Sequence, residues 1–306
     1  DRTFKFHHGF FQPRPAQSLI MKPFSLNIKG SLREFDSPVV MGILNVTPDS
    51  FYAGSHAFGH QAIEHRVQEI IAQGADMIDI GGYSSRPGAD EVSEAEEMQR
   101  IERGLAIIRD FDKSIPVSVD TFRAAVARRA IEEWGADIVN DISGGMADPA
   151  MFDTVAGLRA PYILMHMRGT PKTMQSLTGY NDVTADVVAE LSKPLHRLML
   201  KGVADVIIDP GFGFAKTTGQ NYELFNNLDK IAELLERPLL VGISRKSMIT
   251  RICDITPDEA LPGTIALNTA AIMKGASIIR VHDVAAARQA VTVLSELTKT
   301  SRPAHQ

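Results

Sequence analysis

Residues 202–214 read Gly-Val-Ala-Asp-Val-Ile-Ile-Asp-Pro-Gly-Phe-Gly-Phe, and this stretch contains the parts of one β/α unit in order. A glycine at the end of a helical segment supplies the left-handed residue that terminates the helix. The short apolar run that follows suits a strand buried on both faces, as in a parallel sheet. The run ends at Asp209, and a glycine-containing turn leads into the next helical segment. The stretch therefore predicts a parallel strand with a polar residue at its carboxyl end.

The same pattern recurs along the whole chain. Eight apolar runs share it: Val39–Val46, Ala75–Gly82, Pro116–Asp120, Asp137–Ser143, Tyr162–Met167, Asp205–Gly211, Pro238–Ser244 and Ser277–Asp283. Apolar spacings of three and four predict helices between them, at His60–Gln73, Phe122–Trp134, Val183–Lys201, Tyr222–Leu235, Pro262–Lys274 and Val284–Lys299. Ser93 and Glu96 form a capping-box signature for a further helix that runs to Arg109. Four of the helices are expected to end at Gly74, Gly135, Gly202 and Gly275.

Eight β/α units without a change of composition predict one α/β domain, a closed (β/α)8 TIM barrel. An open doubly wound sheet is the alternative, and a Gly-x-Gly-x-x-Gly turn or a Walker loop would favour it. The chain contains neither. Residues 25–36 alternate around Lys29-Gly30, which predicts an N-terminal hairpin extension covering the bottom of the barrel. We expect residues 1–24 to be a flexible lead, residues 25–300 the single barrel domain, and the polar stretch 168–182 a mobile loop at the active face.

Composition excludes several classes of protein. The chain has 306 residues, of which 44% are hydrophobic and 23% charged, as in an ordinary globular domain. Its net charge of −5 argues against nucleic-acid binding. No window approaches 18 consecutive apolar residues, so no membrane association is expected, and the first 24 residues lack the apolar core of a signal peptide. Cys253 is the only cysteine, which predicts a protein of the reducing cytoplasm without disulfides.

Polar residues gather where the predicted strands end, which is the catalytic face of a barrel. They are Asn45, Asp49, Arg86, Asp120, Asn140, His166, Asp209, Lys246, Arg280 and His282. Arg280 and His282 are two residues apart and share a face, which favours an anion site over a structural pair. Asn45 and Asp49 offer hard oxygen ligands of the kind that hold Mg²⁺ together with a phosphate. No Cys cluster or close His spacing indicates zinc.

Each candidate also has a plainer interpretation. Asp120 could equally be the N-cap of the next helix. Asn140 and Asp141 point to opposite faces of their strand, so at most one reaches the barrel mouth. His166 is better explained as a hydrogen-bonded core residue than as a ligand, and Lys246 could be a solvated surface lysine. Taken together, the carboxylates and amides suit a flat heterocycle, and the cations suit a phosphate or pyrophosphate.

At these residues the chain resembles the dihydropteroate synthase family of the folate pathway, the target of sulfonamides. The resemblance covers about residues 39–297 and depends on eight motifs in order: Gly42-Ile-Leu-Asn-Val-Thr-Pro-Asp-Ser-Phe51, Asp79-Ile-Gly-Gly-Tyr-Ser-Ser-Arg-Pro-Gly88, Val117-Ser-Val-Asp-Thr121, Val139-Asn-Asp-Ile142, Met165-His-Met-Arg-Gly-Thr-Pro-Lys-Thr-Met174, Asp209-Pro-Gly-Phe-Gly-Phe214, Ser244-Arg-Lys-Ser247 and Arg280-Val-His-Asp283. The second motif departs from the family pattern Gly-Gly-Glu-Ser-Thr-Arg-Pro-Gly, because Tyr83 replaces Glu and Ser85 replaces Thr.

The resemblance implies condensation of 6-hydroxymethyl-7,8-dihydropterin pyrophosphate with p-aminobenzoate, giving 7,8-dihydropteroate and pyrophosphate by an SN1-like path. It implies a pterin site at Asp120, Asn140, Met165, Asp209, Phe214 and Lys246, and a pyrophosphate and Mg²⁺ site at Asn45, Ser85, Arg280 and His282, with Asn45 as the metal ligand. It implies a p-aminobenzoate site at Phe51, Ser85, Arg86, Pro87 and Ser247. The residues expected to take part in catalysis are Asp49, Arg86, Asp120, Asp209 and Lys246.

Two other functions share the pterin site. A pterin-binding barrel of a corrinoid methyltransferase system would have no use for a pyrophosphate site, so Arg280 and His282 argue against it. A catalytically inactive pterin-binding paralogue would keep the pterin residues and change its loops. The resemblance also implies small-molecule substrates as the only partners apart from a second copy in a homodimer.

Overall fold

The computed structural model describes residues 22–47, 56–83 and 91–299 of the chain. Eight of its strands form one all-parallel sheet: β3 Val39–Asn45, β4 Met77–Gly81, β5 Val117–Asp120, β6 Ile138–Asp141, β7 Tyr162–Met165, β8 Val206–Asp209, β9 Leu240–Val241 and β10 Ile278–Val281. Their order is β8-β7-β6-β5-β4-β3-β10-β9. The two ends of this order, β8 and β9, are also connected. Ile208 forms a parallel bridge with Leu239, and the Ile208 amide donates a hydrogen bond to the Pro238 carbonyl. The predicted TIM barrel is therefore confirmed.

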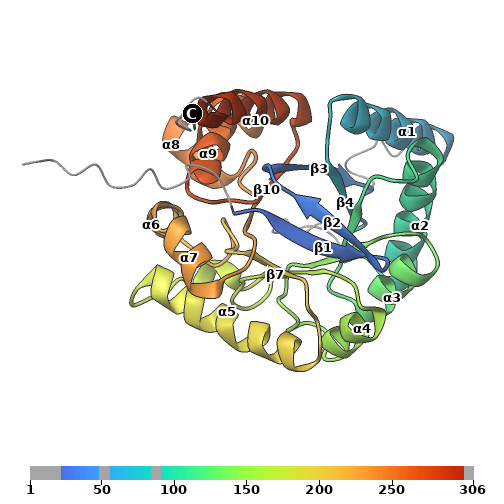
Figure 1. The fold of residues 1–306 in the computed structure, drawn as a ribbon, viewed down its shortest axis with the longest axis horizontal. Helices are drawn as coiled ribbons and strands as arrows, with labels where there is room; N and C mark the ends of the chain where they lie inside the picture. The colour runs from blue at the N-terminus through green and yellow to red at the C-terminus, as the bar shows by residue number, and fades with distance from the viewer. Residues whose placement is uncertain (1–21, 48–55, 84–90, 300–306) are drawn as a thin grey trace, which may run out of the picture.

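The helices form a ring around these strands (Figure 1). They are α1 His56–Ala72, α2 Glu94–Phe111, α3 Ala124–Glu132, α4 Met151–Leu158, α5 Val183–Leu200, α6 Thr218–Asn226, α7 Leu228–Leu235, α8 Ser247–Cys253, α9 Leu261–Met273 and α10 Val284–Lys299. The Ser93 hydroxyl accepts a hydrogen bond from the Glu96 amide, which confirms the predicted cap of α2. The four predicted terminator glycines have φ between 84° and 95°.

The helix predicted as one element at Tyr222–Leu235 is two helices, α6 and α7. They are separated at Asn227, whose side-chain amide donates to the Glu223 carbonyl at 2.9 Å and to the Thr184 hydroxyl at 3.1 Å. Such local side-chain hydrogen bonds compete with the helical pattern. Helix α4 lies where the sequence predicted no individual helix.

The predicted hairpin is also confirmed. Strands β1 Phe24–Ile28 and β2 Ser31–Phe35 pair antiparallel, with Lys29 and Gly30 both at positive φ in the turn. The hairpin lies across the centre of the ring of helices (Figure 1). Its Asn27 amide donates to the Asp205 carboxylate at 2.8 Å, at the start of β8. The hairpin therefore covers the amino-terminal end of the barrel.

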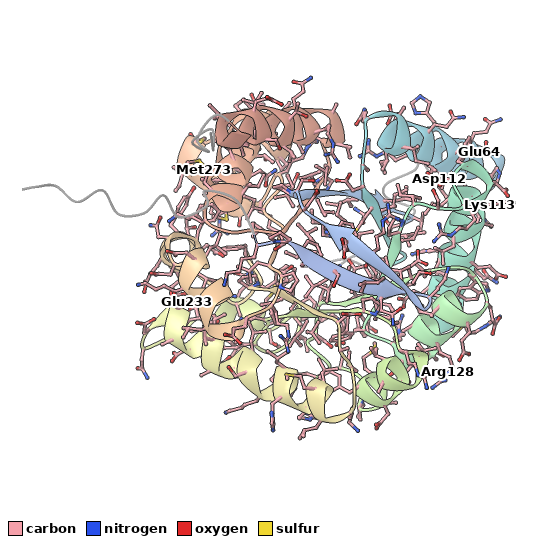
Figure 2. All side chains as sticks on the ribbon, viewed as in Figure 1. Glu64, Asp112, Lys113, Arg128, Glu233 and Met273 are labelled. Carbon is pink, nitrogen blue, oxygen red and sulfur yellow. The ribbon has the colours of Figure 1, made fainter. Side chains whose placement is uncertain are left out.

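The interior of the barrel is layered along its axis. Leu26 and Phe35 of the hairpin pack against an apolar layer from the barrel strands, formed by Val39, Met41, Met77, Ile138, Ile163, Ile207, Leu240 and Ile278. A larger apolar core fills the space between the strands and the helices. Charged side chains such as Glu64, Arg128 and Glu233 lie on the outside of the ring (Figure 2). Among the described residues, no helix is long and apolar enough to cross a membrane.

Candidate active site

A polar layer lies directly above the apolar layer inside the barrel. Side chains alternate along a strand, so a residue two positions beyond an inward apolar residue also points inward. Five strands of the apolar layer each carry a further inward residue two positions along the chain. These residues are Asp79, Asn140, Met165, Asp209 and Arg280, which follow Met77, Ile138, Ile163, Ile207 and Ile278 in that order. These residues belong to five different strands and lie toward the carboxyl ends, where (β/α)8 enzymes carry their chemistry.

Arg280 of β10 connects two carboxylates in this layer. Its Nε donates to Asp79 Oδ2 at 2.6 Å and its Nη2 to Asp120 Oδ2 at 3.2 Å. Burial acts against the charged guanidinium, but Asp79 and Asp120 outweigh it and raise the pKa of Arg280. The predicted cationic residue is therefore present at the barrel mouth, held between two acids.

Asp79 is a residue of the site that sequence analysis did not single out. Its side chain is fully buried, and besides Arg280 it accepts the Asn140 side-chain amide at 3.2 and 3.3 Å. One carboxylate thus positions two of the predicted site residues. The signal available in the sequence was an acidic residue inside an otherwise apolar strand, since a buried charge requires partners.

Asp120 is a residue of the barrel interior. Helix α3 begins after Arg123 without a side-chain cap, so the N-cap alternative for Asp120 is wrong. Burial, and next the charge of Asp79, raises the pKa of Asp120 to about 8. The Arg280 charge acts in the opposite direction and favours the charged carboxylate, whose Oδ2 accepts from the guanidinium.

Asp209, Phe214 and Lys246 come together at the turn that follows β8. The Lys246 Nζ donates to the Phe212 carbonyl at 2.6 Å and lies 4.7 Å from the centre of the Phe214 ring. Burial lowers the pKa of Lys246 to about 8 and raises the pKa of Asp209. Lys246 is therefore a residue of the site, and the surface alternative is wrong. Ser247 is the next residue and the first of α8.

His282 lies two residues beyond Arg280 and contacts Ser244. Its Nδ1 lies 3.0 Å from the Ser244 hydroxyl, and its amide donates to the same oxygen at 3.2 Å. Burial first, and then the charges of Arg280 and Arg245, lower the pKa of His282 to about 4. The imidazole is therefore neutral at pH 7, and its part in an anion site would be as a hydrogen-bond donor.

Asn45 is the last residue of β3. A Cβ placed on Gly81 would lie 3.7 Å from Asn45 Oδ1 and 3.5 Å from the Asp120 Cβ, so the glycine leaves the space between them open. No group of three His, Cys, Asp or Glu side chains suited to a metal occurs within the described ranges. The Asn45 amide oxygen suits Mg²⁺ as a single hard ligand, and substrate oxygens and water would have to supply the rest.

Two further predictions about these strand ends are confirmed. His166 is buried, with Nε2 2.9 Å from Glu190 and Nδ1 3.0 Å from the Lys216 Nζ. Asp141 points away from Asn140 and accepts the Tyr162 hydroxyl at 2.7 Å. His166 is therefore a hydrogen-bonded core residue, and of Asn140 and Asp141 only Asn140 belongs to the polar layer.

Five predicted residues, Asp49, Phe51, Ser85, Arg86 and Pro87, lie outside the described residues. Tyr83, which replaces the family's Glu, is described, and its ring packs edge-on against Phe122 with centroids 5.1 Å apart. The two rings line a mainly apolar cavity of about 300 Å³ together with residues of the 168–182 stretch, including Gly169, Thr170, Pro171 and Lys172. The stretch does lie at the carboxyl face, and its mobility stays a prediction.

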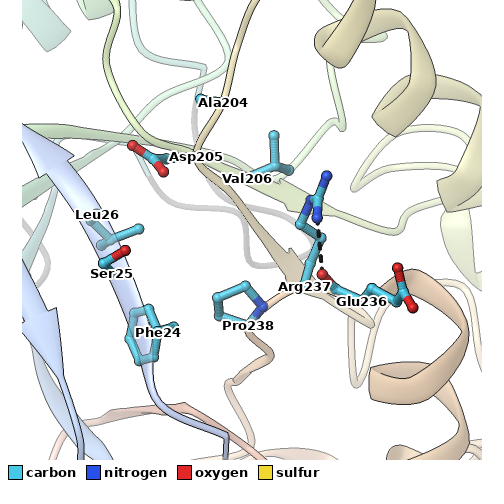
Figure 3. A pocket seen from close by; sticks show the side chains of 9 residues that line it. All are labelled: Phe24, Ser25, Leu26, Ala204, Asp205, Val206, Glu236, Arg237 and Pro238. Atoms are coloured by element: carbon cyan, nitrogen blue, oxygen red, sulfur yellow. Dashed lines mark hydrogen bonds between the residues drawn. The ribbon is translucent and has the colours of Figure 1, made fainter.

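A second cavity, of about 180 Å³, lies at the opposite end of the barrel (Figure 3). It is lined by Phe24, Ser25 and Leu26 of the hairpin and by residues 204–206 and 236–238. The Arg237 guanidinium donates there to the Glu236 carbonyl at 2.9 Å. This end of a (β/α)8 barrel contributes to stability rather than to chemistry. The candidate site is therefore the polar layer at the carboxyl end.

Comparisons with known proteins agree with the motifs. Residues 41–282 match the family model described as pterin binding enzyme. A dihydropteroate synthase of Synechocystis is 45% identical over 261 residues, which cover 84% of this chain and 89% of that protein. The "Folic acid synthesis protein fol1" of Schizosaccharomyces pombe is 41% identical over 80% of this chain, and the chain spans only 34% of its length.

Solved structures give the same result. A Xanthomonas albilineans dihydropteroate synthase with 4-aminobenzoic acid superposes with a TM-score of 0.83 at 36% identity, covering 91% of this chain and 99% of that one. A Yersinia pestis dihydropteroate synthase in a sulfonamide drug complex superposes with a TM-score of 0.82 at 38% identity, covering 91% and 100%. The chain therefore belongs to the dihydropteroate synthase family of pterin binding enzymes, which are transferases.

Proposed function

We propose that this protein condenses 6-hydroxymethyl-7,8-dihydropterin pyrophosphate with p-aminobenzoate to give 7,8-dihydropteroate and pyrophosphate. The observation that carries the proposal is the convergence of polar groups at the carboxyl end of the barrel: Asp79, Asp120, Asn140 and Arg280 from four strands, and Lys246 from the turn before α8. A flat heterocycle with ring N–H groups and a pyrophosphate tail needs both kinds of partner.

The pterin ring would lie against Asp120, Asn140 and Asp209, whose oxygen atoms accept hydrogen bonds from its N–H groups. Met165 and Phe214 supply apolar contact with its faces, and Lys246 donates to a ring acceptor. Because Asp120 and Asp209 are buried, their hydrogen bonds to a charged or polarised ring are stronger than they would be in water. The same carboxylates would stabilise positive charge that develops on the ring as its bond to pyrophosphate breaks.

Arg280, His282 and Asn45 would hold the leaving pyrophosphate. Arg280 offers its guanidinium N–H groups and His282 a neutral imidazole donor, and both act on charge that grows as the bond lengthens. The Asn45 amide oxygen would be the protein ligand of Mg²⁺, which when bound neutralises pyrophosphate charge. The resulting path is SN1-like, since the electron-rich pterin stabilises the methylene carbocation.

The p-aminobenzoate would enter beside Ser247, with Phe51, Ser85, Arg86 and Pro87 completing its site. Its arylamine is neutral at pH 7, so the attack needs no strong general base. Catalysis then depends mainly on positioning the two substrates and on electrostatic stabilisation of the leaving group.

The test is a pyrophosphate-release assay with both substrates and Mg²⁺. Release that requires p-aminobenzoate supports the proposal, whereas tight pterin binding without release would instead identify an inactive paralogue.

Asp209→Asn should weaken pterin binding about tenfold or more, because it removes a buried charge-assisted acceptor. Arg280→Ala should lower kcat about 100-fold through the leaving group.

The matched control for Arg280→Ala is Arg288→Ala. Arg288 also pairs with a carboxylate, that of Asp76, and it donates to the Gly74 carbonyl at 2.9 Å before β4, far from the carboxyl face. This variant should keep the wild-type kcat. Equal kinetics in Arg280→Ala and Arg288→Ala would show that the leaving-group site lies elsewhere.

We also propose a homodimer and a cytoplasmic location, as the resemblance implies.

A further inference from the structure

The turn after β8 has an unusual backbone conformation. Gly211, Gly213 and Ala215 all have positive φ, at 71°, 83° and 49°. A residue with a Cβ is sterically strained in this left-handed region, and Ala215 is fully buried there. The turn presents Asp209 at its start and Phe214 near its end. Side-chain contacts must therefore stabilise this backbone conformation.

Lys216 supplies these contacts from the end of the turn. Its side chain is buried, and its Nζ lies 2.9 Å from the Gly211 carbonyl, 3.1 Å from the Phe214 carbonyl and 3.0 Å from the His166 Nδ1. An ammonium group has three N–H donors and no acceptor. The three neighbours match the three donors, so the charged form of Lys216 is fully hydrogen-bonded without a water molecule.

His166 is oriented to accept from Lys216. Its Nε2 lies 2.9 Å from Glu190 Oε2, and Arg168 Nε donates to the two Glu190 oxygens at 3.1 and 3.0 Å. The hydrogen bond from His166 first, and then that from Arg168, lower the pKa of Glu190 to about 2, and burial lowers the pKa of His166 to about 4. The imidazole is therefore neutral, with its proton on Nε2 and its Nδ1 lone pair toward Lys216.

We propose that Lys216 is a positioning residue of the pterin site, which holds Asp209 and Phe214 in their binding geometry by fixing the carbonyls of Gly211 and Phe214. The proposal rests on the proposed function, because it takes Asp209 and Phe214 as pterin contacts. Lys246 holds the same turn at the Phe212 carbonyl and also faces the site, whereas the three Lys216 hydrogen bonds all go to protein groups. Lys216 therefore acts on the substrate through the turn.

The charge of Lys216 gives this role a pH dependence. Burial lowers the pKa of Lys216 to about 7. The charged and titratable groups that act on it are Asp209 from β8, Glu190 from α5, Lys246 before α8, and His166 and Arg168 after β7. As pH rises above 7, Lys216 loses one of its three donors, and its hold on the turn weakens.

The test is the affinity of Lys216→Met for 6-hydroxymethylpterin, measured by calorimetry beside the steady-state constants. Methionine keeps the apolar stem and removes all three donors. We expect the Kd for the pterin and the KM for its pyrophosphate to rise about tenfold. The KM for p-aminobenzoate should stay within about threefold, and Lys216→Arg should recover part of the pterin affinity. The ratio of variant to wild-type Kd should be larger at pH 6 than at pH 8.5.

Lys201→Met is the matched control, since Lys201 pairs with Asp153 at the surface, at the end of α5. Wild-type pterin affinity in Lys216→Met would overturn the proposal, and so would a fall in kcat with both KM values unchanged, which indicates a smaller folded fraction. If Lys216→Met does not fold, Glu190→Ala decides, because it removes the acceptor that orients His166. It should weaken pterin binding severalfold, and unchanged binding would overturn the proposal. Pterin binding is measured without turnover. If the wild-type protein released no pyrophosphate, the proposed function would fail, and the binding results for Lys216 could still be interpreted.

Discussion

At the scale of single residues, Asp79 determines how the polar layer is arranged. It faces two donors, Arg280 and Asn140, and its two carboxylate oxygens accept from both. Asp79→Asn should reduce the free energy of unfolding by about 3 kcal/mol, because it breaks a buried ion pair, and should lower kcat about tenfold through Arg280. Urea unfolding and pyrophosphate release measure the two effects. Asp153→Asn, at the exposed pair with Lys201, should cost under about 1 kcal/mol. Equal losses in the two variants would contradict this account.

A second residue-scale prediction concerns His282 and acid stability. Its folded pKa of about 4 lies below the unfolded value near 6.5, so the unfolded chain binds a proton between these pH values that the folded chain does not. Stability from this group is therefore present above pH 6.5 and is lost as pH falls toward 4, by up to about 1.4 kcal/mol per pH unit. In His282→Gln the slope of unfolding free energy against pH should be shallower by that amount than in the wild type. Urea unfolding at pH 4.5, 5.5 and 6.5 measures it, with exposed His65→Gln as control. An unchanged slope would refute the prediction.

At the scale of elements, the hairpin stabilises the barrel without entering its chemistry. Leu26 is 1% exposed beneath the barrel, whereas Leu32 on the paired strand is 67% exposed. Leu26→Ala should lower the free energy of unfolding by about 3 kcal/mol through lost burial and a cavity. Leu32→Ala should change it by less than about 0.5 kcal/mol. Both variants should keep the wild-type kcat at 25 °C, because the hairpin lies at the end opposite the site. A large fall in kcat for folded Leu26→Ala would show that the two ends are coupled.

At the scale of the whole molecule, the proposed homodimer can be tested directly. Two-fold dimers are the commonest closed assemblies, and their interfaces use the same patch on both subunits. Light scattering during size-exclusion chromatography should give twice the mass of one chain at micromolar concentration. The mass of a single chain throughout a tenfold concentration series would contradict the proposal.

Most of the architecture could be predicted from local sequence. The strands and most helices follow from short apolar runs and from spacings of three and four, with bounds that differ by only a few residues from those observed, whereas α4 and α8 were not predicted. The break at Asn227 could not be predicted, because it depends partly on Thr184 in another helix. The short extent of β9, Leu240–Val241, was also missed within the predicted run at 238–244.

The sequence by itself determined the type of fold and most of the polar layer. The period of two along each strand places Asn140, Asp209 and Arg280 inside the barrel whatever their partners are. Only the tertiary structure decided the pairings. Arg280 meets Asp79 across 201 positions of the chain, and Lys216 meets His166 across 50. The physical reason is that alternation fixes the direction of a side chain, whereas closure of the barrel fixes which charges face each other, and the burial that shifts their pKa values follows from that closure.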